Sequence, residues 1–167
     1  RDHRDSTSMD HPVKDFTEGI GNGVKGLRVA LPKECFGDNV SNDIKQAVSE
    51  AAKQYERLGA HVEEISLPRM KYALPAYYVI SSAEASSNFA RFDGVKYGYC
   101  TNDFEDIDQR YMRTRAEGFG AEVKRRIMLG SFVLSSEHYD TYYKKALQVR
   151  TLIINDLNAV FEKFDVI

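Results

Sequence analysis

Residues 27–31 read LRVAL, residues 41–58 read SNDIKQAVSEAAKQYERL and residues 61–67 read HVEEISL, and these three stretches decide the fold. The first and third are short β-type runs, each followed by a proline, Pro32 or Pro68. The middle stretch repeats apolar residues at spacings of three and four, which predicts a helix with one apolar stripe. The stripe consists of Ile44, Ala47, Val48, Ala51, Ala52, Tyr55 and Leu58. Ser41 suits the N-cap and Gly59 the left-handed stop. The sequence therefore predicts a right-handed βαβ unit with parallel strands and its helix on one face.

The residues outside this unit have a different sequence pattern. We divide the whole chain into a linker-like segment at 1–23, the βαβ unit at 24–68, a helical segment at 69–164 and the start of a strand at 165–167. Within the helical segment, the apolar spacing favours helices at 70–92, 103–116, 119–132 and 138–163. Pro75 falls in the first turn of the first of these helices, and Asp93-Gly94 ends it.

The predicted fold class is α/β, but the sheet is incomplete. Two strands and the beginning of a third cannot form a stable sheet with both faces covered. A parallel pair normally belongs to a larger sheet, so we expect the missing strands to lie outside residues 1–167. The chain also lacks an initiator methionine. We therefore expect a fragment of a longer domain, which would be poorly folded alone.

Composition excludes some classes of protein. The net charge is -2, so no overall positive field attracts nucleic acid. Cys35 and Cys100 match no metal or redox spacing, and we expect free thiols in a reducing compartment. No apolar run reaches the ~18 residues of a membrane span, and the charged start is no signal peptide. We expect a cytoplasmic protein without a membrane partner.

Several motifs have ordinary structural interpretations. Residues 21–26 read GNGVKG and match GxGxxG, but they precede a strand, so a flexible turn is favoured over a nucleotide site. The four histidines have no metal-ligand spacing, and surface positions are expected for them; they are His3, His11, His61 and His138. Serines at 81–82 and 86–87 lack an activating base, and on a helix they usually satisfy carbonyls or pack closely. No metal, cofactor or nucleophile is therefore predicted within this chain.

Lys124-Arg125-Arg126 lies directly before an apolar run and is the most informative cluster. Its plainest interpretation is a solvated helix face. An arginine at such a boundary can also point into a cleft and bind a carboxylate with two parallel hydrogen bonds. The tyrosine pairs at 77–78 and 142–143 could add hydroxyls, although aromatic packing is their usual role.

Several stretches together resemble one family. They are DSTS at 5–8, KGLRV at 25–29, AYYVI at 76–80, AEASSN at 83–88, RFDGV at 91–95, YGY at 97–99, EGFG at 117–120, EVKRRIMLG at 122–130, and the run from Lys145 through VRTLI at 149–153. In order and interval they are similar to the amidase subunits, or A subunits, of glutamyl-tRNA(Gln) amidotransferases, which are amidase-signature enzymes. The resemblance extends over essentially the whole chain. It implies a partial amidase domain over 1–167, within a mixed sheet flanked by helices.

The resemblance also implies an activity. In the family, a Ser–Ser–Lys triad hydrolyses glutamine through an acyl-enzyme. The ammonia passes to the B subunit, which uses ATP and Mg²⁺ to convert Glu-tRNA(Gln) to Gln-tRNA(Gln); the C subunit completes the heterotrimer. The serine-rich signature and the lysine are absent here, so this chain alone is expected to be inactive, with no catalytic residue of its own.

By position in the family motifs, Tyr77 and Arg126 match residues that hold the α-amino and α-carboxylate groups of glutamine. Arg126 is thereby selected over Arg125. Two alternatives stay open: another amidase-signature carboxamide hydrolase, and a non-enzymatic α/β interaction module. A simple amide has no α-carboxylate to bind, which distinguishes the first alternative. Autonomous, cooperative unfolding would distinguish the second.

Overall fold

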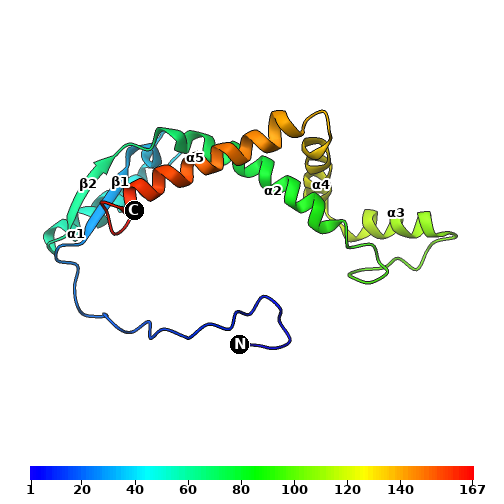
Figure 1. Cartoon of the computed structure of the whole chain (residues 1–167), viewed down its shortest axis with the longest axis horizontal. Helices are drawn as coiled ribbons and strands as arrows, with labels where there is room; N and C mark the ends of the chain where they lie inside the picture. Colours follow the sequence, from blue (N-terminus) through cyan, green and yellow to red (C-terminus); the bar gives the residue numbers. More distant parts are fainter.

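The structure, a computed structural model, describes residues 1–167. Figure 1 shows an elongated molecule with the βαβ unit at one end and α3 at the other, while the N-terminal segment runs away from the folded part. The elements are β1 (Arg28–Pro32), α1 (Asn42–Arg57), β2 (His61–Ile65), α2 (Ala73–Phe89), α3 (Ile107–Gly118), α4 (Ala121–Leu134) and α5 (Lys144–Phe161). Short 3-10 helices at Lys33–Phe36 and Pro68–Tyr72 follow β1 and β2.

The predicted βαβ unit is confirmed. β1 and β2 pair in parallel, in a register that runs from Arg28 opposite His61 to Pro32 opposite Ile65. At residues 165–167, where the sequence predicts the start of a strand, Val166 forms an isolated parallel bridge with Val29. β1 therefore has a neighbour on each side, which is the arrangement expected of an inner strand of a larger sheet.

An ion pair between Arg28 and Asp165 holds residues 165–166 beside β1. The Asp165 carboxylate accepts hydrogen bonds from the Arg28 backbone N–H at 2.9 Å and from its guanidinium Nη2 at 2.6 Å. The backbone N–H of Ala30 then donates to the Val166 carbonyl at 2.9 Å. The Arg28–Asp165 contacts join residues that are 137 positions apart, so the two ends of the folded part lie side by side.

Local details of the unit differ from the prediction at two places. β1 includes Pro32 instead of stopping before it, because the Pro32 backbone, at φ -69° and ψ 117°, is compatible with extended structure. Ser41 occupies the N-cap of α1, but its side chain makes no capping hydrogen bond. Gly59 follows α1 with φ +95°, so the predicted left-handed stop is confirmed.

The apolar stripe of α1 is present but only partly covered. No residue of α1 is buried, and Ile44, Val48 and Tyr55 remain substantially exposed. Beside this stripe lies an apolar cavity of about 240 Å³, also lined by Val29 and Ile167. Apolar surface therefore stays uncovered beside the two-stranded sheet.

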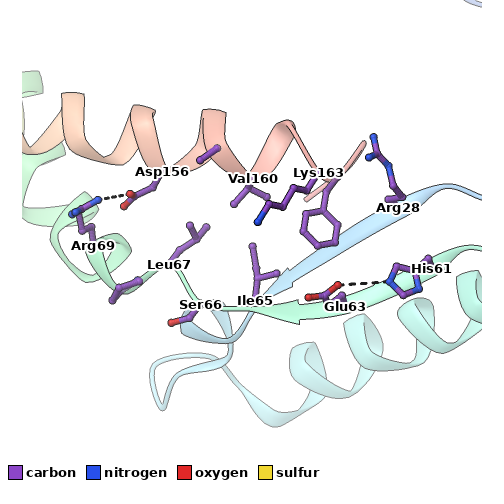
Figure 2. A pocket seen from close by; sticks show the side chains of 13 residues that line it. Arg28, His61, Glu63, Ile65, Ser66, Leu67, Arg69, Asp156, Val160 and Lys163 are labelled. Atoms are coloured by element: carbon purple, nitrogen blue, oxygen red, sulfur yellow. Dashed lines mark hydrogen bonds and ion pairs between the residues drawn. The ribbon is translucent and has the colours of Figure 1, made fainter.

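Figure 2 shows α5 on one side of the two strands and α1 on the other. Leu67 and Phe164 are buried on the α5 side. The predicted helix at 138–163 begins instead with a π-helical turn at Tyr139–Tyr143, and the α-helix starts at Lys144. The other predicted helices are present with shifted ends: α2 begins three residues later than predicted, and α3 begins four residues later.

α2 and α4 form the main helix pair of the helical segment. They meet where Gly130 faces the Ser82 carbonyl, with the buried side chains of Ser82 and Val133 around the crossing. The hydroxyls of Ser86 and Ser131 lie 3.0 Å apart across the pair. These small residues let the two backbones approach closely, and the close approach positions the side chains described next.

Candidate functional site

Tyr77 and Arg126 come from different helices and lie side by side. Tyr77 is on the second turn of α2, and Arg126 is one turn before Gly130 on α4. The pKa of the Arg126 guanidinium is raised, first by its hydrogen bond to Glu122 and next by the Tyr77 side chain. The structure thus brings together the two residues that the sequence selected, although they are 49 positions apart.

The electrostatic centre of this cluster is Glu122. Its carboxylate accepts hydrogen bonds from Arg125 Nε and Nη2, both at 2.8 Å, and from Arg126 Nε at 2.9 Å. Hydrogen bonds from Arg125 and then from Arg126 lower the pKa of Glu122 to about 2. The carboxylate is therefore ionised at neutral pH, and the cluster of two guanidiniums and one carboxylate has a net positive charge.

The two arginines differ in how they are engaged. Arg125 uses two nitrogens on Glu122 and its side chain is 65% exposed, whereas Arg126 uses one nitrogen and is 32% exposed. Arg126 thus has more donors free and lies closer to the helix pair. This is chemistry suited to a carboxylate ligand. That Tyr77 and Arg126 hold glutamine stays a prediction.

A cavity of about 320 Å³ lies on the α5 side of Tyr77. Ile80, Ile153 and Ile154 make it largely apolar, and Glu84 and Arg150 add one charge of each sign. Arg126 does not line this cavity. Tyr77 therefore separates an apolar hollow on the α5 side from the arginine cluster on the α4 side.

A larger cavity of about 670 Å³ lies between β2 and α5, away from Tyr77 and Arg126 (Figure 2). Its charged side chains are mostly paired with each other. Arg69 pairs with Asp156, and His61 Nε2 lies 3.6 Å from a Glu63 carboxylate oxygen. Lys163 also lines this cavity. The arginine cluster combines two guanidiniums with a tyrosine from a second helix, so we place the candidate site at Arg126.

The other motifs take the structural roles expected of them, with one exception. Gly21, Gly23 and Gly26 all have positive φ and precede β1, as a turn requires. Ser81 Oγ donates to the Tyr78 carbonyl, and Ser82 and Ser86 pack against α4. Both cysteines are free thiols. The exception is His138, which is half-buried, not a surface residue, with its ring centroid 4.0 Å from that of Phe132.

Sequence reasoning missed Glu122 as part of the cluster. The signal was available, because Glu122 stands three residues before Arg125 and four before Arg126, and such pairs meet on a helix. Residues 1–167 contain no group of three or more His, Cys, Asp or Glu side chains that could hold a metal ion. None of the helices combines the length and the apolar character needed to cross a membrane.

Two curated relatives of this chain share one description. The chain is 55% identical over 166 residues to the glutamyl-tRNA(Gln) amidotransferase A subunit of Streptococcus mutans and 54% identical to that of Pediococcus pentosaceus. In each case 99% of this chain and 34% of the relative are covered. The chain thus spans about a third of the length of the curated relatives it matches.

Solved structures agree on the fold. The crystal structure of the glutamyl-tRNA(Gln) amidotransferase A subunit from Thermotoga maritima has a TM-score of 0.63 and 37% identity, covering 99% of this chain and 31% of that one. A bacterial aryl acylamidase of the amidase-signature family has a TM-score of 0.64 at 20% identity with the same coverage, and shows the fold alone. The sequence model described as Amidase matches residues 1–167. The α/β arrangement of a small parallel sheet with flanking helices is therefore an amidase-signature fold, and this chain belongs to the amidase family.

Proposed function

We propose that this chain is the glutamine-binding part of the amidase subunit of a glutamyl-tRNA(Gln) amidotransferase. Identity of 54–55% to such subunits over 99% of the chain supports the assignment. The observation that carries the binding role is the Arg126 guanidinium beside Tyr77, which uses only its Nε on Glu122. A guanidinium with free donors binds a carboxylate through two parallel hydrogen bonds.

In the proposed mechanism, Arg126 binds the α-carboxylate of glutamine and Tyr77 lies at the α-amino end. The Ser–Ser–Lys residues belong to a part of the enzyme outside residues 1–167. The nucleophilic serine attacks the side-chain amide and releases ammonia, and water then hydrolyses the acyl-enzyme to glutamate. Covalent catalysis with oxyanion stabilisation divides one difficult step into two easier ones.

The proposal places the amidase subunit in a cytoplasmic heterotrimer with the B and C subunits. The B subunit would use ATP and Mg²⁺ to activate Glu-tRNA(Gln), and the ammonia would convert it to Gln-tRNA(Gln). The net charge of -2 supports a division of labour in which the partners supply most of the contact with tRNA.

The test is a glutaminase assay on the full-length amidase subunit with its partners, comparing wild type with Arg126→Ala. We expect the KM for glutamine to rise roughly 10- to 100-fold, because charge-assisted hydrogen bonds to the substrate are lost, while kcat changes little. Arg57→Ala, at the exposed end of α1 and far from the cluster, is the matched control and should keep the wild-type KM.

If Arg126→Ala hydrolyses glutamine as wild type does, the binding role of Arg126 is wrong. If the wild-type enzyme prefers simple carboxamides to glutamine, the chain belongs to a general amidase and not to a tRNA amidotransferase.

A further inference from the structure

Arg125 and Glu122 form an ion pair beside Arg126. Both oxygens of the Glu122 carboxylate accept from Arg125, through Nε and Nη2 at 2.8 Å each. Two parallel hydrogen bonds between planar groups fix the plane of the carboxylate as well as its position. One of the same oxygens then accepts from Arg126 Nε at 2.9 Å. The order of contacts is therefore Arg125, Glu122, Arg126 and finally Tyr77.

Glu122 contacts the side of the Arg126 guanidinium and leaves its end free. Nε is the nitrogen that Arg126 uses on Glu122. The Nη1 and Nη2 groups can take a carboxylate while Nε stays bound to Glu122, because a guanidinium has five donors in one plane. Glu122 and a ligand carboxylate thus do not compete for the same donors.

The hydrogen bond between Arg126 Nε and Glu122 reduces the conformational entropy that Arg126 loses when a ligand binds. A free arginine side chain loses rotamer freedom when it binds a ligand, and a guanidinium already fixed at one nitrogen loses less. The Tyr77 side chain of α2 lies beside the same guanidinium. The free end of Arg126 is therefore held in one orientation before a ligand arrives.

We propose that Glu122 is a positioning residue, which orients the Arg126 guanidinium for the α-carboxylate of glutamine and is itself held by Arg125. The inference rests on the proposed function, since it requires Arg126 to bind that carboxylate. It adds two residues to the binding machinery that do not touch the substrate.

Two other roles for Glu122 predict different results. As an acidic residue in the first turn of α4, it could serve only to stabilise the helix N-terminus. In that case its loss would affect stability but not discriminate between substrates. As a carboxylate on Arg126, it could instead occupy the site, and its loss would then tighten glutamine binding.

The experiment uses the full-length amidase subunit with its partners and two substrates, glutamine and glutamine α-amide, in which a carboxamide replaces the α-carboxylate. We expect Glu122→Gln to raise the KM for glutamine about threefold to tenfold, with kcat within about twofold of wild type. The KM for glutamine α-amide should not change. Thermal unfolding is measured on the same samples.

Two further variants complete the comparison. Arg125→Ala leaves Glu122 and Arg126 in place but removes the support, so it should raise the KM for glutamine by a smaller factor. It also tests the proposal independently if Glu122→Gln fails to fold. The matched control is Asp140→Asn, which breaks another exposed i,i+4 ion pair, with Lys144 at 3.0 Å, and should leave both KM values unchanged.

The outcomes separate this inference from the proposed function. If Arg126→Ala raises the KM for glutamine but Glu122→Gln and Arg125→Ala do not, positioning by Glu122 is overturned and the proposed function stands. A lower KM in Glu122→Gln, or equal rises for both substrates, also overturns it. If Arg126→Ala itself has no effect, the proposed function fails first.

Discussion

Gly130 is the residue at which the α2–α4 pair is most sensitive to substitution. A Cβ atom added there would lie 2.0 Å from the Ser82 carbonyl oxygen and 2.6 Å from Ser86 Cβ. Real Cβ atoms essentially never approach other heavy atoms closer than 3.0 Å. The nearest atom belongs to the backbone of α2 and cannot rotate away, so Gly130→Ala must move the helices apart by about 1 Å.

The expected cost follows from two opposing effects. Overpacking of this kind destabilises a protein by about 1–3 kcal/mol, and replacing a helical glycine by alanine returns at most ~1 kcal/mol. Separation would also break the contact between the Ser86 and Ser131 hydroxyls, now 3.0 Å apart. We expect a net loss of about 1–2 kcal/mol in the free energy of unfolding.

The assay is urea unfolding of the full-length amidase subunit, in which this loss corresponds to a lower midpoint by roughly 0.5 M. Gly37→Ala is the control, because its added Cβ meets nothing nearer than 3.8 Å and its φ is -66°. The KM for glutamine should rise as well, since Arg126 lies one turn from Gly130. Equal midpoints for Gly130→Ala and Gly37→Ala would refute the close approach of α2 and α4.

Two further perturbations test the contacts that hold the sheet and the turn after it. Arg28 lowers the pKa of Asp165 to about 2, so the stabilisation is present above the unfolded pKa of about 3.9 and is lost as the pH falls toward 2. Urea midpoints of wild type and Asp165→Asn should therefore differ at pH 6 and converge near pH 2; a difference independent of pH would contradict this. Glu34 accepts from Ser66 Oγ at 2.6 Å and from the backbone N–H of buried Leu67 at 2.8 Å. Glu34→Ala should lower the urea midpoint more than Glu56→Ala on the exposed face of α1, and equal effects would show that this contact adds no stability.

The sequence by itself determined the local elements. The apolar spacing and Gly59 were enough for the βαβ unit, because helix and strand periods depend on neighbours within a few residues. Extended structure near residues 165–167 was also predicted, from a short apolar run, but its pairing with Val29 was not. Two local predictions were wrong. The Ser41 side chain makes no capping hydrogen bond, and a π-helical turn at Tyr139–Tyr143 replaces the predicted start of an α-helix. Both depend on side-chain geometry that composition does not specify.

The candidate site was only partly determined by the sequence. The resemblance to a family selected Tyr77 and Arg126, and the spacing of Glu122 to Arg126 on one helix could have added a third residue. Nothing in the linear pattern indicated that Tyr77 would lie beside Arg126. That proximity arises from the crossing of α2 and α4 at Gly130, where the absence of a side chain lets the Ser82 carbonyl approach.

Only the tertiary structure decided which apolar faces are covered. The stripe of α1 has the same helical spacing whether or not a neighbour packs on it, yet no residue of α1 is buried here. Ala83 and Val133, by contrast, are almost fully buried at the α2–α4 pair. Periodicity specifies which residues share a face, whereas burial depends on which element packs against that face, and this partner is distant in sequence.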